Sequence, residues 1–155
     1  MNTKAPLIPM EDFFRNPEKS SFQISPSGYH VAFMKPWKTR MNVFVMNMNT
    51  KKEKRLTASE SRGLYGFTWL TSDRIGYVKD DGGDENMHFY AINIDGTNEI
   101  DLTPFDNIQA RIIDDLEEDP NNVIIGLNKR NPQIHDPYRI NINNGKMKMI
   151  AENPG

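Results

Sequence analysis

The sequence predicts an all-β protein made of β-propeller blades: three four-stranded antiparallel repeats that form an incomplete propeller. Three similar blocks carry this prediction, FVMNMNTKKEKRLT (44–57), YAINIDGTNEIDLT (90–103) and YRININNGKMKMIA (138–151). Their aligned positions are 46 and 48 residues apart throughout. A repeat of about 40–50 residues that holds four short strands is typical of a propeller blade.

Each block predicts a hairpin, because a polar turn separates two short strands. Asn, Asp and Gly stand in these turns, where the backbone needs a positive φ. A second turn-and-strand unit precedes each block: SPSGYHVAF (25–33), TSDRIGYV (71–78) and DPNNVIIGL (119–127). A helical repeat fits less well, because Asn and Gly interrupt every apolar helical face. A β-sandwich would not repeat at a nearly constant step.

The repeats divide the chain into four parts. We expect a lead-in over 1–20, blade 1 over 21–60, blade 2 over 61–106 and blade 3 over 107–155. Within the lead-in, Pro9 and Pro17 bound a segment that predicts a short helix from Met10 to Asn16. Its adjacent Phe13 and Phe14 are expected to anchor the helix against the first blade.

Composition excludes several classes of function. The chain of 155 residues has 19 basic and 21 acidic side chains, so no overall charge favours nucleic acid or an anionic membrane. It has no cysteine, which excludes disulfides, thiolate metal sites and thiol nucleophiles. No apolar run reaches the length of a membrane span. No signal peptide is visible, which favours the cytoplasm unless a leader was removed, as in a periplasmic or secreted protein.

The sequence also lacks the motifs of hydrolytic catalysis. A hydrolase nucleophile needs a G-x-S-x-G elbow, and none of the seven serines has that context. His30, His88 and His135 occupy different places in their repeats and show no paired-ligand spacing. We therefore expect no catalytic residue, no cofactor and no resident metal in this chain.

An acidic glycine turn, Asp80-Asp81-Gly82-Gly83-Asp84-Glu85-Asn86, is the most informative local cluster. Carboxylates on such a turn can bind an ammonium group or an arginine of a partner. Asp84, Glu85 and Asn86 are therefore candidates for contact with a substrate or another domain. Two alternatives stay open: a solvated hairpin connection, and a calcium site, although the spacing misses the EF-hand pattern.

A short basic segment is the second candidate contact. Lys129 and Arg130 lie on an expected loop and are candidates for an interdomain contact. Two charges are too few for nucleic acid, because a typical binder makes about six to ten phosphate contacts. The acidic run over 114–119 is expected to be a hydrated loop. Trp37, Phe67, Trp69 and Tyr77 are expected to pack between blades.

Three longer stretches carry a resemblance to a known family. They are DFFRNPEKSSFQISPSGYHVAF (12–33), KDDGGDENMHFYAINIDG (79–96) and DDLEEDPNNVIIGLNKRNPQIHDPYRIN (114–141). Together they resemble the N-terminal propeller of prolyl oligopeptidase family serine peptidases, in the branch of the acylaminoacyl peptidases. This propeller is TolB-like, a group whose blades carry an S-P-D-G turn; here Ser27 replaces the aspartate.

The resemblance implies a function for the chain. Members of the family join a propeller of about six to eight blades to an α/β-hydrolase domain with a Ser-Asp-His triad. The propeller covers the active site, limits substrate size and helps bind the peptide. The chain would then be a non-catalytic propeller fragment that gates and helps bind peptides for a hydrolase domain outside it. The alternative is a stand-alone TolB-like interaction module without enzymatic activity.

An incomplete propeller leads to a prediction about association. The outer faces of the first and third blades lack neighbours, and exposed apolar sheet surface favours association. We expect a homo-oligomer through these open blade edges, for instance two half-rings that close into one ring. Light scattering at high micromolar concentration measures this directly, and a stable monomer there would contradict it.

Overall fold

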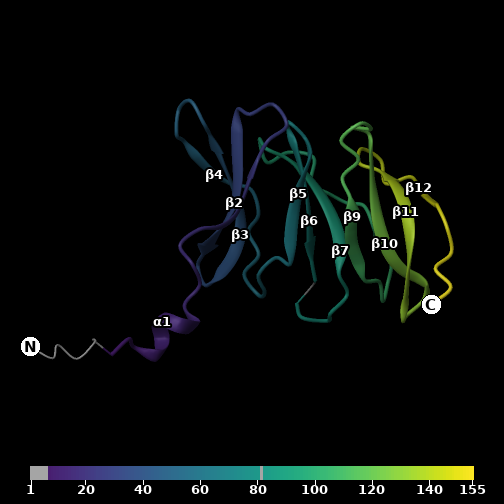
Figure 1. Ribbon diagram of the computed structural model, residues 1–155, viewed down its shortest axis with the longest axis horizontal. Helices are drawn as coiled ribbons and strands as arrows, with labels where there is room; N and C mark the ends of the chain where they lie inside the picture. The colour runs from purple at the N-terminus through teal and green to yellow at the C-terminus, as the bar shows by residue number, and fades with distance from the viewer. Residues whose placement is uncertain (1–6, 81) are drawn as a thin grey trace, which may run out of the picture.

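Three four-stranded antiparallel sheets form the protein (Figure 1). The computed structural model describes residues 7–80 and 82–155. The sheets follow one another along the chain, as the fold class predicted from the sequence requires. Their strands, in chain order, are β1 (Ser20–Ile24), β2 (His30–Trp37), β3 (Arg40–Asn47), β4 (Glu53–Arg55); β5 (Gly66–Thr71), β6 (Arg74–Lys79), β7 (His88–Asn93), β8 (Ile100–Asp101); β9 (Ala110–Asp114), β10 (Asn122–Asn131), β11 (Ile134–Asn141) and β12 (Met147–Met149).

Equivalent backbone hydrogen bonds show that the three sheets are repeats of one unit. The residue after the third strand donates to the carbonyl of the turn before the second strand. These bonds are Met48 to Tyr29, Ile94 to Asp73 and Ile142 to Asn121, at 2.9, 2.9 and 3.0 Å. The sequence alignment with steps of 46 and 48 residues therefore matches positions that are equivalent in space.

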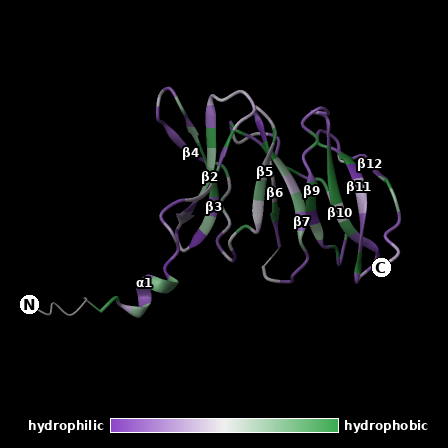
Figure 2. Ribbon diagram, viewed as in Figure 1, coloured by the Kyte–Doolittle hydropathy of each residue, from purple (hydrophilic) through white to green (hydrophobic). Residues whose placement is uncertain are grey.

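Two apolar cores lie between the blades, one on each side of blade 2. Figure 2 shows that hydrophobic residues lie mainly on the strands of the sheets. Phe67, Trp69 and Tyr77 are buried in the core shared with blade 1, as expected from the sequence. Phe89 is buried in the core shared with blade 3. Because successive strand residues point to opposite faces, blade 2 supplies side chains to both cores.

The first strands of neighbouring blades lie close together. Gln23 of β1 donates its side-chain amide to the Phe67 carbonyl at 2.9 Å and accepts a bond from the Trp69 indole at 3.1 Å. At the other junction, Thr68 of β5 donates to Asp115, just past β9, at 3.2 Å. The blades therefore converge along β1, β5 and β9, as blades do towards a propeller axis.

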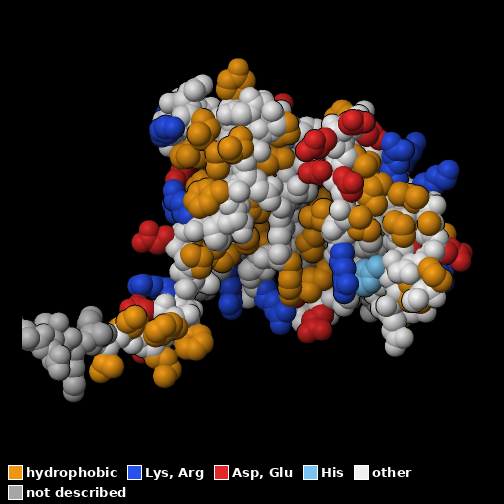
Figure 3. Space-filling model, viewed as in Figure 1, with side chains coloured by type: hydrophobic (Ala, Val, Ile, Leu, Met, Phe, Trp, Pro, Cys, Tyr) orange, Lys and Arg blue, Asp and Glu red, His pale blue; other side chains and the backbone are white. Residues whose placement is uncertain are grey.

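The lead-in helix α1 (Met10–Phe14) does not pack as the sequence predicted. Phe13 and Phe14 are 68% and 82% exposed, and no residue of the helix is buried. Figure 1 shows α1 displaced from the sheets, and Figure 3 shows hydrophobic side chains on its surface. The anchoring role was wrong, because a helix of five residues presents no stable apolar face. With this as its only helix, the described part of the chain has none long enough to cross a membrane.

Gly76 provides a test of the packing on blade 2. A Cβ at this position would lie 2.5 Å from Cζ of the buried Phe89 ring. We expect Gly76→Ala to lower the free energy of unfolding by about 1–3 kcal/mol through overpacking. Chemical denaturation at fixed protein concentration measures the change.

Gly66 is the matched control in the neighbouring strand. A Cβ there would meet no heavy atom of the described residues within 4 Å. Gly66→Ala should therefore be neutral, or stabilise by up to about 1 kcal/mol through the unfolded chain. Equal losses in the two variants would show that the close approach of Phe89 to Gly76 does not limit packing.

Candidate functional site

The junction of blades 2 and 3 has two chemically different ends. Because the strands alternate in direction, the connections of every blade alternate between them. We call the end that carries the β6–β7 connection and the β10–β11 hairpin the loop end. The end that carries the β5–β6, β7–β8 and β11–β12 turns is called the turn end. The loop end holds both candidate segments named from the sequence.

The acidic loop between β6 and β7 is folded by its own polar groups. Gly82, Gly83 and Glu85 have φ values of 68°, 97° and 62°, so this segment uses the positive φ that its glycines allow. The Asp84 carboxylate accepts the Asn86 backbone N–H at 3.0 Å and its side-chain amide at 2.9 Å. Asp84 and Glu85 are exposed. Asp81 lies outside the described residues.

Asp80, the residue directly after β6 at the start of this loop, is buried. It is 5% exposed, and its Oδ2 lies 3.4 Å from Nη1 of Arg62 and 3.5 Å from the Tyr65 hydroxyl. Arg62 also donates to the Tyr65 hydroxyl at 2.9 Å. This hydrogen bond, and then the charge of Asp80, raise the pKa of Arg62. Arg62 and Tyr65 could not be recognised from the sequence, because they precede β5 and carry no motif.

A chain of bonds joins the acidic loop to blade 3. The Met87 carbonyl, just after the loop, accepts the Ala110 N–H at 2.7 Å. The N–H of Gln109 donates to the Asn128 side chain at 2.6 Å, and Asn128 precedes Lys129. The structure therefore brings the two candidate segments, which are more than 40 residues apart in sequence, to one junction.

The two basic candidates lie near the end of strand β10 rather than on the expected loop, and both already have partners within the chain. The Lys129 ammonium lies 3.7 Å from the centroid of the Phe105 ring. Arg130 makes a two-bonded ion pair with the buried Asp136, at 2.9 and 3.0 Å, and also donates to the Asn153 carbonyl at 2.9 Å. Arg130 thus closes the β10–β11 hairpin, whereas Lys129 is exposed and makes no ion pair among the described residues. Their role in binding another domain stays a prediction.

A cavity of about 410 Å³ opens beside the acidic loop. Its walls are mostly apolar, with one arginine and one glutamine among them. The lining residues are Tyr65, Gly66, Val78, Met87, Gln109, Ala110, Arg111 and Ile112. A mostly apolar cavity with a few polar groups beside it is the usual form of a small-ligand site.

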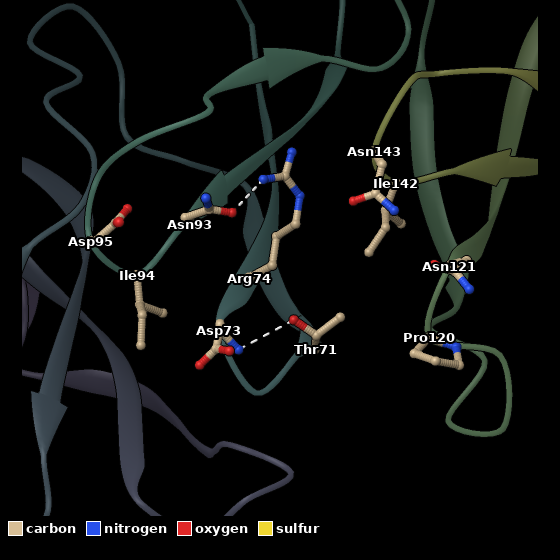
Figure 4. Close-up of a pocket in the computed structure, with 10 residues that line it drawn as sticks. All are labelled: Thr71, Asp73, Arg74, Asn93, Ile94, Asp95, Pro120, Asn121, Ile142 and Asn143. Atoms are coloured by element: carbon tan, nitrogen blue, oxygen red, sulfur yellow. Dashed lines mark hydrogen bonds between the residues drawn. The ribbon is translucent and has the colours of Figure 1, made fainter.

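The turn end of the same junction holds a second cavity, of about 580 Å³ (Figure 4). Residues from both blades line it, and Arg74 extends between them. The acidic run over 114–119 lies nearby, and acidic side chains gather at the upper edge in Figure 3. Within 7–80 and 82–155, no group of three or more His, Asp or Glu is arranged to hold a metal ion.

Comparisons with known proteins give peptidase relatives. No family model matches the chain. The chain is 30% identical over 149 residues to dipeptidyl aminopeptidase BIII of Pseudoxanthomonas mexicana, covering 95% of this chain and 22% of that protein. It is 27% identical over 158 residues to dipeptidyl peptidase family member 6 of Caenorhabditis elegans, covering 95% and 21%. The chain therefore spans about a fifth of the length of these two relatives.

Solved structures share the fold. The propeller domain of the Trilobed protease from Pyrococcus furiosus matches with a TM-score of 0.63 at 15% identity, over 88% of this chain and 43% of that one. Acylaminoacyl peptidase of Pyrococcus horikoshii gives 0.59 at 16%, over 87% and 25%. TolB from Acinetobacter baumannii gives 0.60 at 16%, over 87% and 32%. At these identities the match shows the fold alone.

The ion pair of Arg130 and Asp136 predicts acid sensitivity. Hydrogen bonds from Arg130, and then from the Asn153 backbone, lower the pKa of the Asp136 carboxyl. A lowered folded-state pKa contributes stability above the unfolded value of about 3.9, and this stability is lost as pH falls through the folded-state pKa. Asp136→Asn should therefore melt below the wild type at pH 7 and lose less stability between about pH 5 and 2.

A double-variant cycle supplies the control for this prediction. Arg130→Met removes the other half of the pair, and the double variant Arg130→Met/Asp136→Asn removes both. Thermal melts across the pH range should show that the two changes are not additive. Additive losses at pH 7 would mean that Arg130 and Asp136 stabilise the hairpin independently.

Proposed function

We propose a function from the relatives of this chain, which is a TolB-like propeller segment of the kind found in prolyl oligopeptidase family peptidases, as its sequence predicted. The propeller gates and helps bind peptide substrates for an α/β-hydrolase domain elsewhere in the same protein. The segment itself supplies no nucleophile. Its partners are then the peptide and the hydrolase domain, with no role for nucleic acid or a membrane.

The arrangement at the loop end is the observation that supports this function. The loop that carries the exposed residues Asp84 and Glu85 leads into Met87, which lines a cavity with mostly apolar walls. A carboxylate can accept charge-assisted hydrogen bonds from a peptide ammonium or arginine, and the apolar walls can take a side chain. The exposed Lys129 lies at the same junction, where a carbonyl or carboxylate of a neighbouring domain can reach it.

Neutralising the acidic loop tests this proposal. We expect the double variant Asp84→Asn/Glu85→Gln to raise KM for peptides about three- to tenfold in the full-length gene product, with kcat little changed. The reason is that these carboxylates contact the peptide away from the reacting bond. Hydrolysis of short peptides with a free amino terminus, followed over a range of concentrations, measures both constants.

Glu117→Gln/Glu118→Gln is the matched control, because it removes two exposed carboxylates of the same blade junction at the turn end. The control should leave KM unchanged. Equal effects of the two double variants would assign the change to overall charge and reject the contact. A full-length gene product without peptidase activity would reject the gating function and favour the alternative, a stand-alone interaction module.

A further inference from the structure

Arg74, at the turn end, is a buried cation without a counter-ion. It is the first residue of β6 and is 7% exposed. Its guanidinium donates to the side-chain oxygen of Asn93 and to the Asn98 carbonyl, both uncharged acceptors. No carboxylate of the described residues forms an ion pair with it, and its Nε has no acceptor among them. Burial lowers the pKa of Arg74.

Blade 2 departs from the other two blades at this position. The residues equivalent to Arg74 are His30 and Asn122, which face Asn47 and Asn141 across their hairpins. In those blades the asparagine oxygen accepts backbone N–H groups of its own turn, from Asn49 and Thr50 or from Asn143 and Asn144.

In blade 2 the same asparagine has a different partner. The oxygen of Asn93 accepts from Arg74, and Asp95 takes over the turn by accepting the Thr97 N–H at 2.8 Å and its hydroxyl at 2.6 Å. Two neighbouring exchanges thus hold the guanidinium in place. A residue that breaks the pattern of a repeat, with a compensating substitution beside it, is expected at functional positions.

The guanidinium extends into the cavity between the blades (Figure 4). Asn93 flanks it on blade 2, and Asn143 lies across the cavity on blade 3. A buried charge without a counter-ion is costly, and a carboxylate placed here would offset that cost through a planar, two-bonded contact. The volume of about 580 Å³ is in the range of small-molecule sites.

The charges around the cavity define the ligand further. Asp73 and Asp95 also line it, and the Asp73 carboxylate has no hydrogen bond or ion pair within the described residues. Two carboxylates disfavour a polyanion such as phosphate and favour a ligand with an ammonium group. We propose that this pocket binds a small zwitterion, a free amino acid or short peptide, with its carboxylate on Arg74 and its ammonium group at Asp73.

Titration of the full chain with the dipeptide Ala-Ala tests the proposal, with calorimetry and amide NMR as readouts. We expect a dissociation constant of about 1 mM or below, with shifts at Arg74 and Asn143. Ala-Ala amide, which lacks the carboxylate, should bind at least tenfold more weakly, and so should N-acetyl-Ala-Ala, which lacks the ammonium group. No binding of Ala-Ala at about 10 mM, or equal binding of the amide, would overturn the proposal.

Variants locate the site on the molecule. Arg74→Met should abolish binding of Ala-Ala. Asn143→Asp should weaken it several-fold without touching a bond of Arg74, because the added carboxylate competes for the guanidinium. The control Arg139→Met removes an arginine of blade 3 that lies outside this cavity and should bind as the wild type does.

Each outcome is decisive for the turn-end pocket. Binding that survives both Arg74→Met and Asn143→Asp would place the ligand elsewhere and reject the proposed pocket. If Arg74→Met does not fold, Asn143→Asp and the amide comparison still decide the question. The measurement is made on the chain itself and at the opposite end from the acidic loop, so its failure is independent of any failure of the peptidase function.

Discussion

The structure depends on the burial of blade 2 on both of its faces. In β6, the residues from Arg74 to Val78 are all buried. Ile75 and Tyr77 pack towards blade 1, and Val78 packs towards blade 3. Because successive strand residues point to opposite faces, this strand must be apolar on both, and Gly76 provides the room that the Phe89 ring needs. Both candidate sites lie at the ends of a junction that this packing holds together.

The open face of blade 1 is partly covered by its own side chains. Phe22, Phe33 and Phe44 form a row of stacked rings, with centroids 5.4 and 6.2 Å apart. Lys19 and Lys35 lie over two of the rings and both pair with Glu53, whose pKa these hydrogen bonds lower. Long cationic side chains laid over apolar surface are a common protection of sheet edges.

This layer of lysine and glutamate side chains reduces the exposed apolar surface of blade 1. The prediction of association rests on that apolar surface. Phe33 is fully buried by this layer, whereas Phe22 and Ile24 remain 59% and 68% exposed at the edge. A ring closure between two copies would have to displace or match the lysine–glutamate layer. The predicted association would therefore rest on a few exposed residues rather than on the whole sheet face, which favours a weak, salt-dependent contact over a large apolar one.

The periodic features of the chain could be predicted from its sequence. Polar pairs between residues far apart in the sequence could not. The repeat step, the hairpin turns and the burial of Phe67, Trp69 and Tyr77 follow from local chemistry and were confirmed. Trp37, also expected to pack between blades, lies outside both cores. The contact of Arg62 with Asp80 joins a residue before β5 to a residue just after β6, and no sequence spacing predicts it. The burial of Arg74 was also hidden, because an arginine after a turn is ordinarily exposed. The lead-in helix formed as predicted. Its anchoring was wrong for a related reason, since it required a tertiary contact that sequence alone does not specify.

Strand direction explains why one junction offers two kinds of binding chemistry. In every blade, the connection between the second and third strands reaches the loop end, where its length and sequence can vary without disturbing the cores. The turn end carries tight hairpins whose Asn and Asp side chains are fixed by backbone bonds. A site at the loop end can adapt to different peptides, whereas a site at the turn end is preorganised and selective for one small ligand. Arg74, which stands where the other two blades have His30 and Asn122, lies at this preorganised end.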